Sequence, residues 1–217
     1  MKIQALLFDL GKVLIDFNFD TGVQALHACC SISRDRLDQV LWDETWIGRY
    51  ERGEISTREF HQYLCETANL NMELPQFCRT WSSVFLPEPI VSEDLLKDLK
   101  RRYPLILVSN TNEAHSDFIR TQYRIFDYFD HHILSYEVGS LKPDAKIFEH
   151  AILASGCSPE ALFFTDDRAE NVHAAKRLGI HAHQFVSESR LIKALRKAGV
   201  EVDGNGMNDE TQDLCRF

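Results

Sequence analysis

Strand-like apolar runs alternate with helix-like segments from residue 105 onward, and this alternation restricts the chain to a few folds. The predicted strands cover residues 3–9, 105–109, 132–135, 161–165 and 180–185. The predicted helices in this part begin after residue 112 and cover 144–155 and 169–178. Because strands joined by helices run parallel through right-handed crossovers, the pattern predicts an α/β fold with a Rossmann-like parallel sheet.

Residues 16–99 interrupt this alternation and indicate a helical insert. From about residue 20 to 100, apolar residues recur at helical spacing, Ser33 and Ser56 stand at N-cap positions, and no run resembles a strand. We expect about four helices, with a further helix near 91–101. The predicted parts are a core of residues 1–15 and 100–200, a four-helix-bundle cap of 16–99 and a loosely held tail of 203–217. An insert after the first strand lies above the carboxyl ends of the strands, where it would cover a site.

The composition limits the partners of the chain. Its 217 residues are 44% apolar and 26% charged, and the formal net charge is −9. Duplex nucleic acid and anionic membranes are held mainly by Lys and Arg, so this charge argues against both. No apolar stretch reaches the ~20 residues that span a bilayer, and the N-terminus lacks signal-peptide features. We expect a cytoplasmic protein that acts on a small molecule, and the sequence favours no particular oligomeric state.

Acidic residues end two of the predicted strands. Asp9 ends the first, and Asp166 and Asp167 follow the run at 161–165. A carboxylate beside a buried strand is costly unless a cation or hydrogen-bond donors meet it, and adjacent acids repel each other. Hard oxygen ligands of this kind suit Mg²⁺, so a magnesium site is predicted here. Asp167 has an alternative role as N-cap of the following helix, which would leave Asp166 to bind the metal.

Groups suited to an anion lie elsewhere in the chain. Residues 109–112, Ser-Asn-Thr-Asn, stand between a strand and a helix, where free N–H groups and the helix dipole favour phosphate. Lys142 precedes Pro143 at the start of a helix, so its charge can be aimed at the same oxygens and can keep Asp9 ionised. The sequence therefore predicts a phosphate site beside the metal site.

The segments around Asp9, residues 109–112, Lys142 and Asp166 resemble, in the same order, the four motifs of the haloacid dehalogenase superfamily. The resemblance extends from about Lys2 to Phe185. It implies a Mg²⁺-dependent phosphatase with an aspartate nucleophile and a small helical cap after the first motif. By this resemblance Asp9 forms an aspartyl-phosphate, and Ser109 and Lys142 bind the phosphoryl group. Asp166 would bind the metal, supported by Asp167 and Asn171.

A finer resemblance points to a substrate class. The segments 8–13, 16–18, 51–56 and 109–112 resemble the bacterial α-D-glucose-1-phosphate phosphatase group. This resemblance implies a sugar phosphate, such as glucose-1-phosphate, as the substrate.

Gly11 departs from the superfamily pattern, in which the residue two after the nucleophile is mostly an aspartate that serves as general acid and base. Glycine retains the backbone carbonyl, which would bind Mg²⁺, and loses the proton donor. General acid-base help is worth about 10²–10⁴-fold in rate, so its loss need not abolish turnover. A sugar-1-phosphate, whose leaving hydroxyl is relatively acidic, would tolerate the loss better than a simple alkyl ester. Lys12, or a water held by Asp16 or Asn112, are the alternative proton donors.

The predicted mechanism has two steps. Asp9 attacks phosphorus in line, and water then hydrolyses the acyl phosphate. The groups expected to hold the phosphoryl oxygens are Mg²⁺, Lys142, Ser109 and the N–H groups of Gly11, Asn110 and Thr111.

Two alternative functions stay open. One is a metal-free 2-haloacid dehalogenase, against which the adjacent Asp166 and Asp167 argue; the other is a catalytically silent binding or regulatory module, which the missing acid at Gly11 favours.

Overall fold

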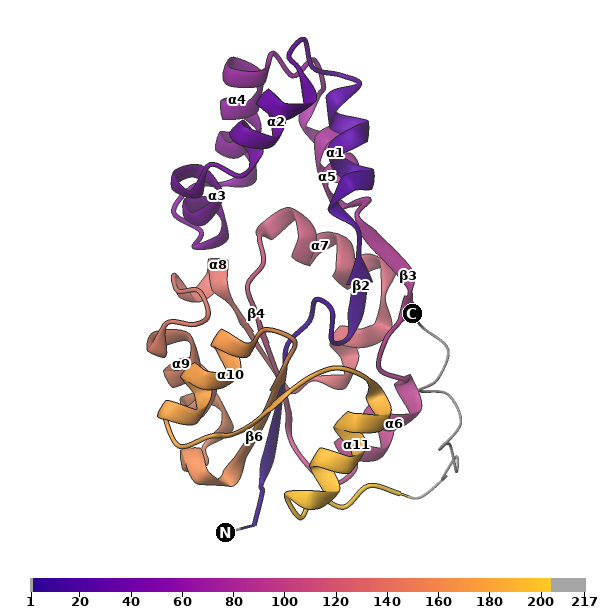
Figure 1. Ribbon diagram of the computed structural model, residues 1–217, viewed down its shortest axis with the longest axis vertical. Helices are drawn as coiled ribbons and strands as arrows, with labels where there is room; N and C mark the ends of the chain where they lie inside the picture. Colours follow the sequence, from indigo (N-terminus) through magenta and orange to yellow (C-terminus); the bar gives the residue numbers. More distant parts are fainter. Residues whose placement is uncertain (1, 204–217) are drawn as a thin grey trace.

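A five-stranded parallel sheet lies at the centre of the computed structural model, which describes residues 2–203 (Figure 1). Its strand order is β5-β4-β1-β6-β7. The strands are β1 (Ala5–Phe8), β4 (Leu105–Ser109), β5 (His131–Leu134), β6 (Leu162–Asp166) and β7 (His181–Gln184). All five predicted strands form, and the predicted α/β fold with a Rossmann-like parallel sheet is confirmed.

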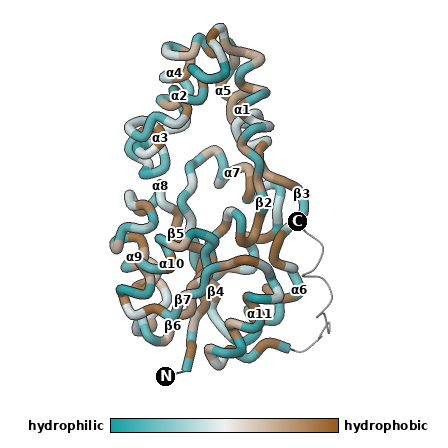
Figure 2. Tube along the Cα trace, viewed as in Figure 1, coloured by the Kyte–Doolittle hydropathy of each residue, from teal (hydrophilic) through white to brown (hydrophobic). Residues whose placement is uncertain are grey.

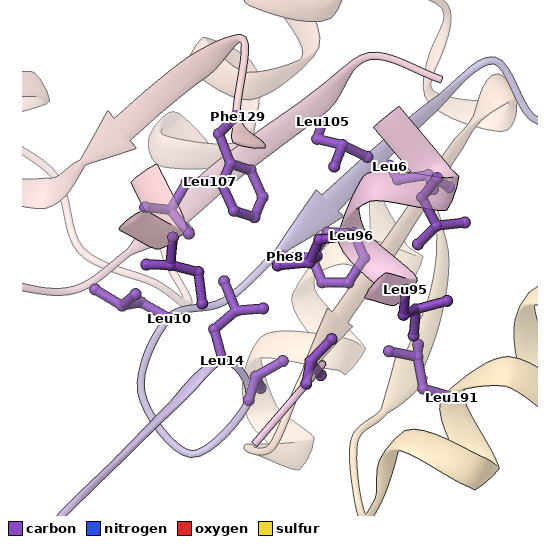
Figure 3. Close-up of a cluster of buried hydrophobic side chains, with 14 of the residues drawn as sticks. Leu6, Phe8, Leu10, Leu14, Leu95, Leu96, Leu105, Leu107, Phe129 and Leu191 are labelled. Atoms are coloured by element: carbon purple, nitrogen blue, oxygen red, sulfur yellow. The ribbon is translucent and has the colours of Figure 1, made fainter. Parts of the chain in front are cut away.

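Helices cover both faces of this sheet (Figure 1). One face carries α6 (Glu93–Lys100), α7 (Glu113–Gln122) and α11 (Glu188–Lys197); the other carries α9 (Ala145–Ser155) and α10 (Ala169–Arg177). Side chains of β1 alternate between them: Leu6 and Phe8 pack in the first cluster (Figure 3), and Ala5 and Leu7 pack in the second. Burial on both faces explains why this strand is a continuous apolar run.

Five further helices form a layer above the carboxyl ends of the strands (Figure 1). They are α1 (Phe19–His27), α2 (Arg34–Leu41), α3 (Glu44–Glu51), α4 (Thr57–Ala68) and α5 (Leu74–Ser82), and they share a hydrophobic cluster to which Ala114 of α7 also belongs. The predicted caps form: Ser33 Oγ accepts from the Arg36 N–H, and Ser56 forms a capping box with Glu59. The expected number of about four was too low because Asp43 caps one more short helix.

An antiparallel ribbon joins these helices to the sheet and corrects the expectation that no strand lies between about residues 20 and 100. β2 (Ile15–Phe17) pairs with β3 (Phe85–Pro89). Pro87 and Pro89 lack an N–H group and are normally confined to sheet edges, so the sequence of β3 does not resemble a strand. The short helix α8 (Ser135–Val138) was also not predicted, and neither was α11.

The predicted tail, 203–217, lies outside the described residues except for Asp203. The Asp203 carboxylate accepts from Arg101 at 3.0 Å, and its N–H donates to Asp98 at 2.8 Å. The helices show mixed hydrophilic and hydrophobic segments (Figure 2). Within residues 2–203, none of them is both long enough and apolar enough to cross a lipid bilayer.

Candidate active site

Four residues predicted for the site come together at the carboxyl end of the sheet. Strand β1 lies between β4 and β6, so Asp9, just after β1, is flanked by Ser109 at the end of β4 and Asp166 at the end of β6. Lys142 reaches the same point from the segment before α9. These side chains are all buried. The strand order thus explains how residues distant in sequence share one site.

Lys142 lies between the two strand-end carboxylates. Its Nζ is 2.6 Å from Asp9 Oδ1 and 2.7 Å from Asp166 Oδ2, and it donates to the Val108 carbonyl at 2.8 Å. These contacts use all three ammonium hydrogens. Burial alone would lower the pKa of Lys142, but Asp9 and Asp166 raise it above its ordinary value. The lysine therefore holds the carboxylates together, and the predicted contact with phosphate requires exchange of one of these bonds.

Asp9 presents one carboxylate oxygen without a partner. Oδ1 accepts from the Leu10 N–H at 2.7 Å and faces Lys142, whereas Oδ2 has no donor among residues 2–203. Burial raises the pKa of Asp9 to about 7, against the opposing effect of Lys142 and with a further rise from Asp166. A cation bound beside Asp9 would favour its ionised form. Oδ2 is therefore the oxygen that is open to a new bond.

Asp166 is fixed by hydrogen bonds to both of its oxygens. Oδ1 accepts from the Arg168 N–H at 2.8 Å, and the Asn171 Nδ2 donates to both oxygens at 3.0 Å. Asn171 thus lies where a supporting residue was predicted. The N-cap of α10 is Arg168, which has no side-chain cap bond, so the alternative role of Asp167 as helix cap is wrong.

The acidic groups of this site fit a divalent cation. Carboxylate oxygens of Asp9, Asp166 and Asp167 lie within 4.8 Å of one another. Burial raises the pKa of Asp167, and the neighbouring Asp166 adds to the rise. Asn171 Oδ1 is buried and has no hydrogen-bond partner among the described residues. Three carboxylates and an unpartnered amide oxygen around a single lysine suit a hard cation that takes oxygen ligands.

The Asn110 side chain positions Lys142. Its Oδ1 accepts from the Lys142 N–H at 2.7 Å, and its Nδ2 donates to the Lys142 carbonyl at 2.9 Å. This pair of bonds fixes the backbone of Lys142 against the end of β4. The backbone N–H of Asn110 therefore remains a predicted donor to phosphate, whereas its side chain is used by Lys142.

The rest of the predicted phosphate loop divides into two kinds of residue. Ser109 is buried, and among residues 2–203 its hydroxyl makes only a long bond of 3.4 Å to the Asn110 carbonyl, so it can turn to a ligand. The Thr111 N–H instead donates to Ser135 Oγ at 2.9 Å, and that hydroxyl donates back to the Thr111 carbonyl. The prediction that the Thr111 N–H is free for phosphate is therefore wrong. Ser135 belongs to the unpredicted helix α8, and no sequence pattern marked it.

The end of helix α3 contacts α8, which follows strand β5. Gly53, just after α3, has φ +68°, and a Cβ there would lie 2.1 Å from the Tyr136 carbonyl of α8. Only glycine accommodates this approach. Glu51, the last residue of α3, lies within electrostatic range of Arg168, which follows the acidic pair. Both Glu51 and Gly53 belong to the segment 51–56 that carries the finer resemblance, and a glycine after a helix end is typical of a helix terminus.

Glu51→Gln is expected to stabilise the protein at pH 8 and to have little effect at pH 5. Burial raises the pKa of Glu51 to about 7, against Arg168 and Arg52. A carboxyl group with a raised pKa in the folded state favours folding most below its ordinary pKa near 4.5, and this contribution is lost as the pH rises through 7. Thermal melts at both pH values test this expectation. The exposed Glu88→Gln is the control, and an equal shift at both pH values would contradict it.

Helix α7 carries contacts with the upper helices. The Thr57 hydroxyl, at the start of α4, donates to Glu113 Oε2 at 2.6 Å. The His115 ring stacks on Trp81 of α5 at 5.2 Å, and its Nε2 donates to the Trp81 carbonyl at 3.1 Å. Burial lowers the pKa of His115 to about 4, so the ring is neutral, and its Nδ1 accepts from Asn112. Helix α7 therefore links these helices to the loop that contains Ser109.

Comparisons with known proteins agree with this geometry. The chain is 30% identical over 190 residues to the D-ribitol-5-phosphate phosphatase of Bacteroides thetaiotaomicron, covering 84% of this chain and 91% of that protein. It is 28% identical over 180 residues to a sesquiterpene phosphatase of Aspergillus oryzae, covering 82% and 87%. A crystal structure of a HAD family enzyme from B. thetaiotaomicron, in complex with magnesium and inorganic phosphate, has a TM-score of 0.78 and 27% identity, covering 85% and 95%.

A family-level match covers most of the chain. Residues 3–179 match the family described as haloacid dehalogenase-like hydrolases. This match spans β1, β4 and β6, whose carboxyl ends carry Asp9, Ser109 and Asp166. The chain therefore belongs to the haloacid dehalogenase-like hydrolases.

Proposed function

We propose that this protein is a Mg²⁺-dependent phosphatase that hydrolyses a small phosphate monoester through an aspartyl-phosphate on Asp9. The observation that carries the proposal is the unpartnered Asp9 Oδ2, whose carboxylate is grouped with those of Asp166 and Asp167 and contacts the buried Lys142. Two relatives named as phosphatases and a similar structure that holds magnesium and phosphate support it.

The metal ligands we propose are Asp9, Asp166 and the Gly11 carbonyl, with Asp167 and Asn171 in support. The grouping of the acids and the unpartnered Asn171 Oδ1 support this set. When bound, Mg²⁺ would neutralise charge on the phosphoryl oxygens. Phosphoryl transfer depends mainly on positioning and electrostatics. The hydrogen bonds to both Asp166 oxygens would therefore keep this metal-binding carboxylate in a fixed position.

The chain's own residues account for the covalent step. Asp9 Oδ2 attacks phosphorus while Lys142, which already holds Oδ1, keeps the carboxylate oriented. The Ser109 hydroxyl and the N–H groups of Gly11 and Asn110 bind the phosphoryl oxygens. Asn110 keeps Lys142 in place through its two bonds to that backbone. Water then attacks the acyl phosphate and regenerates Asp9.

The substrate class we propose is a sugar phosphate such as glucose-1-phosphate. The hydroxyl on an anomeric carbon is more acidic than an ordinary alcohol, so its ester depends less on the acid that Gly11 cannot supply. The relative named for D-ribitol-5-phosphate supports a small polyhydroxylated substrate. We also propose the division into a core of 1–15 and 100–200 and a cap of 16–99, because all residues of the upper hydrophobic cluster except Ala114 come from the cap.

Phosphate release from a panel of esters tests the proposal. The panel contains glucose-1-phosphate, glucose-6-phosphate, ribitol-5-phosphate and farnesyl phosphate, each assayed with Mg²⁺ and with EDTA. We expect release that requires Mg²⁺, with the highest kcat/KM for glucose-1-phosphate. Mg²⁺ binding without release from any ester would indicate a silent binding module. Halide release from 2-chloropropionate in EDTA would indicate the dehalogenase instead.

A further inference from the structure

The space beside Gly11 is filled by an aromatic ring. A Cβ at Gly11 would lie 2.7 Å from Phe17 Cε1 and 3.4 Å from Phe17 Cδ1. The ring cannot swing away freely, because it packs against Phe19 at 4.9 Å and edge-on against Phe85 at 6.3 Å between ring centroids. Residue 11 therefore has no room for any side chain while Phe17 stays in place.

The turn between Gly11 and Phe17 holds this ring over the glycine. Lys12 has φ +59°, and its N–H donates to the Ile15 carbonyl at 2.9 Å. Its Nζ donates to the Phe17 carbonyl at 2.7 Å, pairs with Asp16, and lies 4.7 Å from the centroid of the Phe17 ring. Asp16 Oδ1 also accepts from the Phe17 N–H at 2.8 Å. Lys12 and Asp16 thus both contact Phe17 and help to fix its position.

The residues predicted as alternative sources of the proton, Lys12, Asp16 and Asn112, each make hydrogen bonds to neighbouring residues. Lys12 and Asp16 bind each other and Phe17. Both amide atoms of Asn112 are used by His115: its Oδ1 accepts from the His115 N–H, and its Nδ2 donates to the ring. These bonds therefore hold all three side chains within their own segments.

We propose that Phe17 is a specificity-determining residue. Its ring occupies the space that an acidic side chain at residue 11 would need, and this restricts the enzyme to phosphate esters of acidic alcohols. The inference rests on the proposed phosphatase activity and specifies its substrate class. That class contains esters of anomeric hydroxyls, phenols and enols, and it excludes esters of simple alkyl alcohols.

The chemical step shows why the leaving group decides the rate. Asp9 Oδ2 forms a bond to phosphorus as the bond from phosphorus to the alcohol oxygen breaks. The electron pair of the broken bond stays on that oxygen, which leaves as an anion and takes a proton from solvent water afterwards. Without proton transfer in the transition state, the full negative charge must be carried by the alcohol, so its acidity sets the barrier.

A leaving-group series on the unaltered protein is the first test. The probes are substituted phenyl phosphates from 4-nitrophenyl to 4-methoxyphenyl, with n-butyl phosphate as the alkyl ester, all assayed in Mg²⁺. We expect kcat/KM to fall roughly tenfold for each unit of alcohol pKa, as for a reaction without a general acid. A nearly flat dependence would overturn the inference. Absence of Mg²⁺-dependent turnover of 4-nitrophenyl phosphate would overturn the proposed function and this inference with it.

A double-mutant cycle on residues 11 and 17 is the second test. Gly11→Asp alone places a side chain against the ring, so we expect no gain with n-butyl phosphate, and Phe17→Ala alone supplies no acid. The two together are expected to raise kcat/KM for n-butyl phosphate by about 10²–10⁴-fold and to flatten the leaving-group dependence. The matched control is Gly11→Asn with Phe17→Ala, which has the same shape without the acid and should show neither change.

Glu51 is the competing source of a proton, because it is a cap carboxyl within electrostatic range of Arg168 beside the acidic pair. If Glu51 were the acid, the unaltered protein would give a shallow dependence, and Glu51→Gln would make it steep. That result would overturn the inference. A steep dependence that is the same in both proteins would support it, and circular dichroism of each variant confirms that the proteins compared are folded.

Discussion

Asp9→Asn is expected to reduce Mg²⁺-dependent phosphate release by on the order of 10⁴–10⁶-fold, the range seen when a covalent nucleophile is removed. Asparagine has nearly the shape of aspartate and can still accept the Leu10 N–H bond, but its amide does not form an acyl phosphate. Lys142 keeps its contacts with Asp166 and Val108. The fold should therefore survive, because the change removes a reactive group and no packing.

Single-turnover phosphate release and acid-quench detection of a phosphorylated protein measure this effect. The exposed Asp94→Asn on α6 is the matched control and should leave both readouts unchanged. A variant at Asp9 that retained a tenth of the activity would rule out the covalent route. A variant that lost its cooperative thermal transition would show instead that Asp9 has a structural role.

Lys142→Met is expected to destabilise the protein by about 3–5 kcal/mol when it is unfolded in EDTA at pH 8. The change leaves Asp9, Asp166 and the half-buried Asp167 with no cation between them, and Asp166 has no exposed surface. It also removes the donor to the Val108 carbonyl. Because a bound metal supplies positive charge at the same place, Mg²⁺ should restore part of the lost free energy of unfolding.

Urea unfolding with EDTA and with Mg²⁺ measures this loss and its recovery. The exposed Lys146→Met, on α9, is the matched control and should change the free energy of unfolding only slightly. An unchanged free energy of unfolding in the Lys142 variant would mean that the carboxylates are hydrated or protonated at no cost. That outcome would contradict the buried ion-pair network described for this site.

The parts of the site that could be predicted depend on strands that are buried on both faces. Such strands are continuous apolar runs, and the polar residue that ends each run marks the edge where the chemistry lies. This is why Asp9, Ser109 and Asp166 were predicted and are found together. Lys142 was predicted from its place before Pro143 at the start of a helix together with its order among the motifs, because a lysine taken alone resembles any surface lysine.

The parts that could not be predicted depend on partners that only the fold supplies. The Thr111 N–H is a free donor in the sequence pattern, but a hydroxyl from α8 takes it. A glycine at residue 11 shows that a side chain is missing and does not show that Phe17 fills the space. Strand β3 was missed because its two prolines contradict strand propensity, which the pairing with β2 overrides.

The position of α7 has a thermodynamic consequence for ligand binding. Its first residues follow the loop that contains Ser109, and the same residues bond to Thr57 and Trp81 of the upper helices. The proposed phosphate site and the docking of those helices are therefore linked through one helix. Linkage of this kind is reciprocal: by whatever factor a bound phosphoryl group favours docking, docking tightens phosphate by the same factor. Product inhibition by inorganic phosphate and the docking of those helices should then change together.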